Sequence, residues 1–94
     1  MSTAELKAAL EALLADTPEL YARLCEEGVV PTDDAALSSE HLETVRVVRT
    51  LVHELEVNWP GVEVILHMRT ELIATRRQIA ELARLLREQQ QHSA

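Results

Sequence analysis

Residues 54–68 read ELEVNWPGVEVILHM and contain the only tryptophan of the chain, Trp59, followed directly by Pro60 and Gly61. Sequence typical of helices flanks this stretch on both sides. A proline inside a helix loses a hydrogen bond and clashes with the preceding turn, but it fits the first turn well. The stretch therefore predicts a corner between two helices, with Asn58 or Trp59 as the cap. Trp59 is predicted to pack at this corner, with a direct contact to a partner as the alternative.

The helix that follows the corner is predicted to start near Pro60 and to continue to about Glu88, because neither proline nor glycine interrupts it after Gly61. A heptad count over this segment places apolar residues at nearly every a and d position. The series is Ile65, Met68, Leu72, Thr75, Ile79, Leu82 and Leu86, in which only Thr75 is polar. Packing against the first helix of the same chain would cover only part of this stripe. We therefore predict a homodimer whose coiled-coil seam is formed by the six apolar members.

Three shorter helices are predicted before the corner. The first begins at the N-cap Ser2, with Glu5 at the capping-box spacing, and directs Leu6, Leu10, Leu13 and Leu14 to one face. The second starts at Thr17 and Pro18 and ends at Gly28, with Leu20 and Leu24 on its apolar face. Val29 and Val30 are predicted to form a minimal extended piece. The third is capped by Ser38, and its stripe is Leu42, Val45, Val48, Val52 and Leu55.

The composition predicts one small all-α protein. The chain has 94 residues and no phenylalanine, so its core must be aliphatic, and leucine and alanine favour helices. The predicted organisation is a helical head over residues 1–58, a coiled-coil-like helix over 59–88 and a frayed tail over 89–94. No stretch is apolar enough to span a membrane, and the first residues do not resemble a secretory signal. The lone Cys25 suits a reducing compartment, so a cytoplasmic location is predicted.

Charge is distributed unevenly along the chain. Residues 1–45 hold two basic and ten acidic residues, a formal charge of −8, whereas residues 46–94 hold seven arginines against six acids, a charge of +1. Two short helices joined tightly suggest a helix-turn-helix, whose second helix would read DNA. That helix carries Glu19, Glu26 and Glu27 against Arg23 alone, and DNA affinity depends on neutralising phosphates. Sequence-specific DNA binding is therefore the less favoured interpretation.

Four acids gather around the end of the second helix and the loop that follows it: Glu26, Glu27, Asp33 and Asp34. Most surface acids only solvate a protein, but anions near a helix C-terminus are mildly unfavourable. This favours a role in attracting a basic partner. The sequence contains no catalytic constellation and no metal-ligand spacing such as HxxxH or CxxC, so neither enzymatic activity, a metal nor a cofactor is predicted.

Together the turn at Gly28–Val30, the run from Arg49 to Leu55, the WPG corner at Trp59–Gly61 and the long helix 62–88 resemble the chaperone modulator family of the CbpM type. These proteins are similar to shortened relatives of the MerR helix-turn-helix regulators. The resemblance covers roughly residues 17–88, and the WPG corner is its most specific part. The connection from Pro31 to Ser38 is too short for a complete DNA-binding wing.

The resemblance implies that this chain binds the J-domain of a DnaJ-like co-chaperone and regulates its interaction with DnaK. A J-domain presents a basic helix to DnaK, and an acidic protein can compete for that surface. The predicted contact residues are the four acids and Trp59. The competing hypothesis is a DNA-binding transcriptional regulator of the MerR type. A third, a purely structural dimerisation module, predicts neither interaction.

Overall fold

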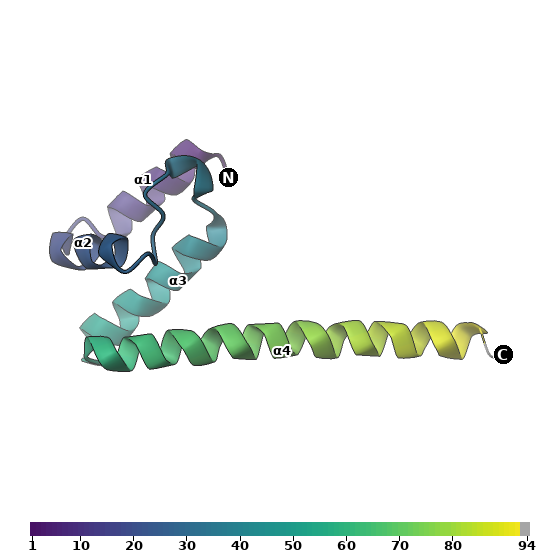
Figure 1. The fold of residues 1–94 in the computed structure, drawn as a ribbon. Helices are drawn as coiled ribbons and strands as arrows, with labels where there is room; N and C mark the ends of the chain where they lie inside the picture. The colour runs from purple at the N-terminus through teal and green to yellow at the C-terminus, as the bar shows by residue number, and fades with distance from the viewer. Residues whose placement is uncertain (93–94) are drawn as a thin grey trace. The chain divides into compact units, whose positions relative to one another are not determined.

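The computed structural model describes residues 1–92, and within them the chain is helical and contains no strand. The predicted all-α class with a long C-terminal helix is confirmed (Figure 1). The α-helices are α1 (Thr3–Leu13), α2 (Pro18–Glu26), α3 (Ser39–Arg49) and α4 (Trp59–His92), with a 3₁₀ turn η1 (Asp34–Ala36) and a π-helical turn η2 (Thr50–Glu54). The chain divides into two compact units, and the boundary falls between Asn58 and Trp59.

Unit 1, Met1–Asn58, has the aliphatic core that the composition requires. Its α1 contacts both α3 and η1. Burying each such side chain contributes about 1.5–3 kcal/mol, which is the main stabilising term in a domain of this size. The core residues of unit 1 are Leu6, Leu10, Leu14, Leu20, Leu24, Val30, Leu37, Leu42, Val45, Val48 and Leu51.

The start of α1 follows the prediction. Ser2 is the N-cap, and its hydroxyl oxygen accepts a hydrogen bond from the backbone N–H of Glu5 at 3.2 Å. The Ser2 hydroxyl in turn donates a hydrogen bond to the Glu5 carboxylate at 3.1 Å, so the two side chains are also linked directly. Of the four leucines predicted on one face, Leu6, Leu10 and Leu14 are buried and Leu13 is only half-buried.

The end of α2 is closed by a Schellman motif. The C-cap is Glu27, and Gly28 follows it with φ of 74°. The Gly28 N–H donates to the Cys25 carbonyl at 3.2 Å, and the Val29 N–H donates to the Leu24 carbonyl at 2.9 Å, which is the bonding pattern of this motif. The predicted extended piece at Val29 and Val30 is therefore wrong. Both N–H groups bond back to Leu24, while the Val30 side chain enters the core.

The end of α3 departs from regular α-helical geometry. Its start is as predicted, with Ser38 as the N-cap. After Arg49, η2 widens the turn, and the Leu55 N–H donates to the Thr50 carbonyl five residues earlier, at 3.1 Å. A π turn holds more residues than an α turn, so side-chain positions rotate out of the α register. Leu51 is buried, Val52 is half-buried and Leu55 is 63% exposed, so the predicted core position of Leu55 is wrong.

The long helix α4 extends four residues beyond the predicted end at Glu88, as far as His92. The expected tail over 89–94 is thus helical up to His92, and residues 93–94 lie outside the described part. Glutamine is a good helix former, and neither glycine nor proline follows Glu88 to end the helix. Pro60 and Gly61 lie in the first turn of α4, where proline fits without losing a hydrogen bond.

We predict that Gly28→Ala destabilises the protein by about 1 kcal/mol, because an L side chain at positive φ is strained while the space around a new Cβ is open. Urea denaturation followed by circular dichroism should show a lower midpoint. Gly28→Asn is the matched control and should lower the urea midpoint less, since asparagine tolerates a positive φ better than alanine does. An unchanged midpoint for the alanine variant would contradict the Schellman closure as a stabilising feature.

Candidate protein-interaction surfaces

The four predicted acids lie on two adjacent elements of unit 1 and are all exposed. Glu26 is the last residue of α2, and Glu27 is its C-cap. Asp33 is the N-cap of η1, and Asp34 is its first residue. We call these four residues the acidic cluster.

Three of the four carboxylates already have partners within unit 1. Glu27 pairs with Arg23 at 3.2 Å, and Asp34 pairs with Lys7 at 3.1 Å. Asp33 accepts a hydrogen bond from the Ala35 N–H at 3.0 Å, which caps η1. Glu26 has no such contact within the described residues. It is therefore the member of the acidic cluster whose charge is most available to a partner.

The pair of Lys7 and Asp34 links α1 to η1. The hydrogen bond from the Lys7 ammonium to Asp34 raises the pKa of Lys7, with a smaller contribution from Tyr21. Both side chains reach solvent, and exposed pairs of this kind contribute little to stability. Asp34 can consequently exchange Lys7 for a cation on a binding partner at small cost.

The second candidate surface is the apolar stripe of α4, defined as Ile65, Met68, Leu72, Ile79, Leu82 and Leu86. Ile65 is half-buried, and the other five are 50–61% exposed in the single chain. Monomeric proteins rarely leave such a continuous row of large aliphatic side chains in water. The structure thus leaves the predicted seam residues accessible along one helix.

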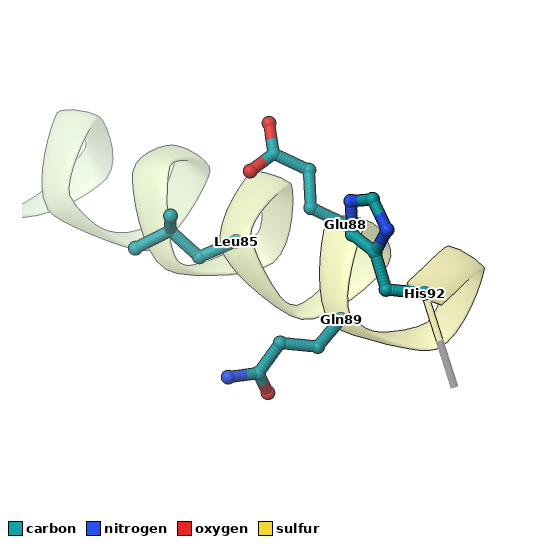
Figure 2. Close-up of a pocket in the computed structure, with 4 residues that line it drawn as sticks. All are labelled: Leu85, Glu88, Gln89 and His92. Atoms are coloured by element: carbon teal, nitrogen blue, oxygen red, sulfur yellow. The ribbon is translucent and has the colours of Figure 1, made fainter.

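Sequence reasoning missed two exposed apolar residues that widen the stripe. Val64 is 58% exposed and Leu85 is 42% exposed, and each immediately precedes an a position of the heptad. Their position was the available signal, because residues at g border the seam of a coiled coil. Figure 2 shows Leu85 with Glu88, Gln89 and His92 around a shallow hollow near the end of α4. All four side chains come from one helix, so this hollow is open helix surface.

Trp59 is the first residue of α4 and is half-buried. The Trp59 side chain is therefore neither fully buried in a core nor fully exposed to a partner. A tryptophan in this setting supplies a large apolar face at low entropic cost, whether to the fold or to a partner. Both roles that the sequence suggested remain predictions.

Two grooves in unit 1 border the connection between α1 and α2. One is mostly apolar and is lined by Glu11, Leu14, Ala15, Pro18, Tyr21 and Ala22. The other carries charges of both signs and is lined by Asp16, Thr17, Pro18, Glu19, Leu20, Arg23, Val52 and His53. Asp16 at the second groove pairs with Arg49 at 3.2 Å. Neither groove combines a nucleophile with a general base in hydrogen-bonding geometry.

The remaining candidates for chemistry are dispersed. Cys25 is a half-buried free thiol. His41 accepts a hydrogen bond at Nδ1 from the Ser38 N–H at 3.0 Å, so it completes the cap of α3. Within residues 1–92, no three His, Cys, Asp or Glu side chains group as metal ligands would. No helix in that range is both long and apolar enough to cross a membrane.

Comparisons of this chain with protein-family models, with curated proteins and with solved structures give no match.

We predict that Ile79→Asp converts a dimer to a monomer, because burying an unpartnered carboxylate at a seam costs several kcal/mol. Light scattering should give the monomer mass for this variant. Thr70→Asp is the matched control, since position 70 lies on the opposite face of α4, and its dimer mass should persist. A dimer mass for Ile79→Asp equal to that of the unmodified chain would exclude the apolar stripe as the seam.

We predict that Trp59→Ala lowers the free energy of unfolding by about 2 kcal/mol, less than the roughly 3–5 kcal/mol lost when a fully buried aromatic is truncated. Thermal melting measures this loss, and a parallel titration with a purified J-domain measures binding. Trp59→Phe should keep most of the stability. A weaker J-domain interaction with an unchanged melt would instead assign Trp59 to the partner contact, and a loss of neither would refute both roles.

Proposed function

We propose that this chain is a chaperone modulator: a cytoplasmic homodimer whose acidic head binds the J-domain of a DnaJ-like co-chaperone and limits its productive encounter with DnaK. The observation that carries the proposal is the charge of unit 1. Residues 1–58 hold twelve acids and four bases, a formal charge of −8. A surface whose charges are mostly of one sign accelerates association with a partner of opposite charge, and a J-domain presents a basic helix.

The acidic cluster supports this proposal in a modified form. Its carboxylates are exposed and lie on one helix end and the turn beyond it, as a steering surface requires. Glu27 and Asp34 are held by internal cations, so their contribution depends on exchanging those pairs. Glu26 has no internal cation to release, so it can attract a basic partner without such an exchange. Steering by such groups affects the on-rate and its salt dependence more than the final affinity.

The same charges argue against the competing DNA-binding hypothesis. In a helix-turn-helix, α2 would enter the major groove and needs cations for phosphates and base edges. Its single arginine, Arg23, is paired with Glu27, while Glu19 and Glu26 are exposed. A MerR-type regulator should bind a heparin column, whereas a modulator of this charge should flow through. Retention at physiological salt would favour the regulator.

The apolar stripe supports the homodimer in the proposal. The exposed row on α4 fits a second copy of the same helix, since identical stripes are self-complementary about a two-fold axis. A dimer would carry two acidic heads. Two linked heads can engage a co-chaperone that itself presents two J-domains with an avidity above that of one head.

We predict that Glu26→Lys slows association with a purified J-domain several-fold at low salt. The reason is loss of attraction between exposed charges, which are screened over about 10 Å at 0.1 M salt and about 3 Å at 1 M. Surface plasmon resonance at the two salt concentrations should show the difference shrinking at high salt, with the off-rate changed less than the on-rate. The melting temperature should hold or rise slightly, because a cation near a helix C-terminus is favourable.

Glu63→Lys provides the matched control. It makes the same change of charge on α4, outside the acidic cluster, and its on-rate should stay close to that of the unmodified chain. Two outcomes would show that the acidic cluster only solvates unit 1. In one, Glu26→Lys and Glu63→Lys change the J-domain on-rate equally. In the other, the on-rate changes with neither salt nor these substitutions. Absence of any J-domain binding by the unmodified chain would refute the proposed function itself.

A further inference from the structure

The mostly apolar groove of unit 1, called the apolar groove below, shares no residue with the acidic cluster. It is formed by the end of α1, the connection that follows and the first half of α2, and its volume is about 420 Å³. Leu14 is 2% exposed and belongs to the core, and Tyr21 is half-buried. Ala15, Pro18 and Ala22 are exposed. The apolar groove is therefore a shallow hollow with an apolar wall that reaches solvent.

Small side chains leave this hollow open. Ala15 in the connection and Ala22 on α2 both end at Cβ, and Pro18 cannot extend beyond its ring. A long side chain at position 15 or 22 would fill the space that these residues leave. An open apolar hollow can bury a side chain of a partner with little rearrangement of the fold around it.

The charges around the apolar groove are of one sign. Residues 11–22 include its whole lining, and they hold three acids, Glu11, Asp16 and Glu19, and no base. The bases on either side of this segment are both engaged by acids. Lys7 pairs with Asp34 at 3.1 Å, and Arg23 pairs with Glu27 at 3.2 Å. The apolar groove is thus complementary to a partner that is apolar at its centre and basic around it.

One side chain connects the apolar groove with the acidic cluster. Tyr21 lines the apolar groove, and its side chain also raises the pKa of Lys7 by hydrogen bonding, so the phenol lies beside that ammonium group. The same ammonium group donates to Asp34 of the acidic cluster. Tyr21, Lys7 and Asp34 therefore form a continuous path over unit 1, and a single segment of a partner can contact both surfaces.

The two surfaces contribute unequally to a complex. Exposed ion pairs add little to affinity, and steering charges act mainly on the rate of encounter. A large apolar side chain that leaves water for a hollow adds more than one such pair. The acidic cluster alone therefore accounts for fast association but not for a persistent complex, whereas the apolar groove can supply the persistent contact.

We propose that the apolar groove is the anchoring site for a basic amphipathic helix of the partner. One large apolar side chain of that helix packs against Tyr21 and Ala22, and its cations face Glu11 and the acidic cluster. Helices of this kind present apolar side chains three or four positions apart and insert them into a groove. The inference rests on the proposed function, in which a J-domain supplies the basic helix, and it adds the surface that holds the complex together.

Ala22→Gln tests the apolar groove without changing the charge. Ala22 is exposed on α2 and glutamine favours helix, so the melting temperature should hardly change. Surface plasmon resonance with a purified J-domain should show a dissociation constant raised about tenfold, chiefly through a faster off-rate. The loss should be similar at about 0.1 M and about 1 M salt, because salt does not screen an apolar contact. The loss caused by Glu26→Lys should shrink over the same range.

Ala12→Gln is the matched control, since Ala12 is exposed on α1 and lines neither groove of unit 1. Its J-domain binding should stay close to that of the unmodified chain. Ala15→Gln fills the hollow from the side of the connection and should weaken binding as Ala22→Gln does. A loss for Ala22→Gln alone would place the contact on the outer face of α2 and overturn the anchoring site.

Other outcomes also separate the anchoring site from the proposed function. Unchanged J-domain binding by Ala22→Gln, a loss equal to that of Ala12→Gln, or a loss that disappears at high salt would overturn the anchoring site and leave the chaperone role standing. A change of dimer mass for Ala22→Gln in light scattering would assign the apolar groove to a contact between copies and overturn it as well. Failure of the unmodified chain to bind any J-domain would refute the proposed function together with the anchoring site.

Discussion

The exposed aliphatic stripe of α4 is the surface on which the proposed homodimer depends. Water disfavours apolar surface by about 25 cal/mol per Å². Five of the six stripe residues are half or more exposed in the single chain, from Met68 to Leu86. A helix of 34 residues is about 50 Å long, so the apolar stripe is a long and narrow surface. An extended apolar surface of this shape is suited to another helix and poorly suited to a small ligand.

In unit 1, by contrast, most of the large apolar side chains are enclosed in a core, and the charged side chains face outward. The core is wholly aliphatic, and the helix ends are closed by Ser2, by Gly28 with Val29 and by Ser38 with His41. Closed helix ends need no further partners for their backbone groups. The acids of unit 1 lie at the surface, where they pair with the few internal cations, accept hydrogen bonds at helix starts or face solvent.

The two units therefore offer different kinds of recognition. Unit 1 has a formal charge of −8, which favours long-range attraction of a basic partner. The second unit holds five arginines against four acids and presents apolar contact area. Charge steers encounter and is weakened by salt, whereas apolar burial supplies persistent association. In this chain the charged surface and the apolar surface lie on separate units.

Local rules were sufficient to predict most of the helices and the stripe from the sequence alone. Ser2, Pro18, Gly28, Ser38 and Pro60 mark helix ends through backbone geometry that each residue carries in itself. The heptad spacing of α4 follows from helical periodicity, so the six residues of the apolar stripe were predictable from the sequence, whereas Val64 and Leu85 beside it were missed. The extra four residues of α4 were missed, because a polar glutamine run resembles a tail although glutamine favours helix.

What only the tertiary structure decided depends on residues that are distant in sequence or on departures from ideal geometry. Lys7 lies 27 residues from Asp34, and Arg49 lies 33 residues from Asp16, so no local pattern predicts that these ions pair. Those pairs, with Arg23–Glu27, determine which acids stay available. The π turn after Arg49 moves Leu55 out of the core because one wide turn rotates every later side chain. Periodicity assumes a uniform helix, so it misplaces the residues that follow such a turn.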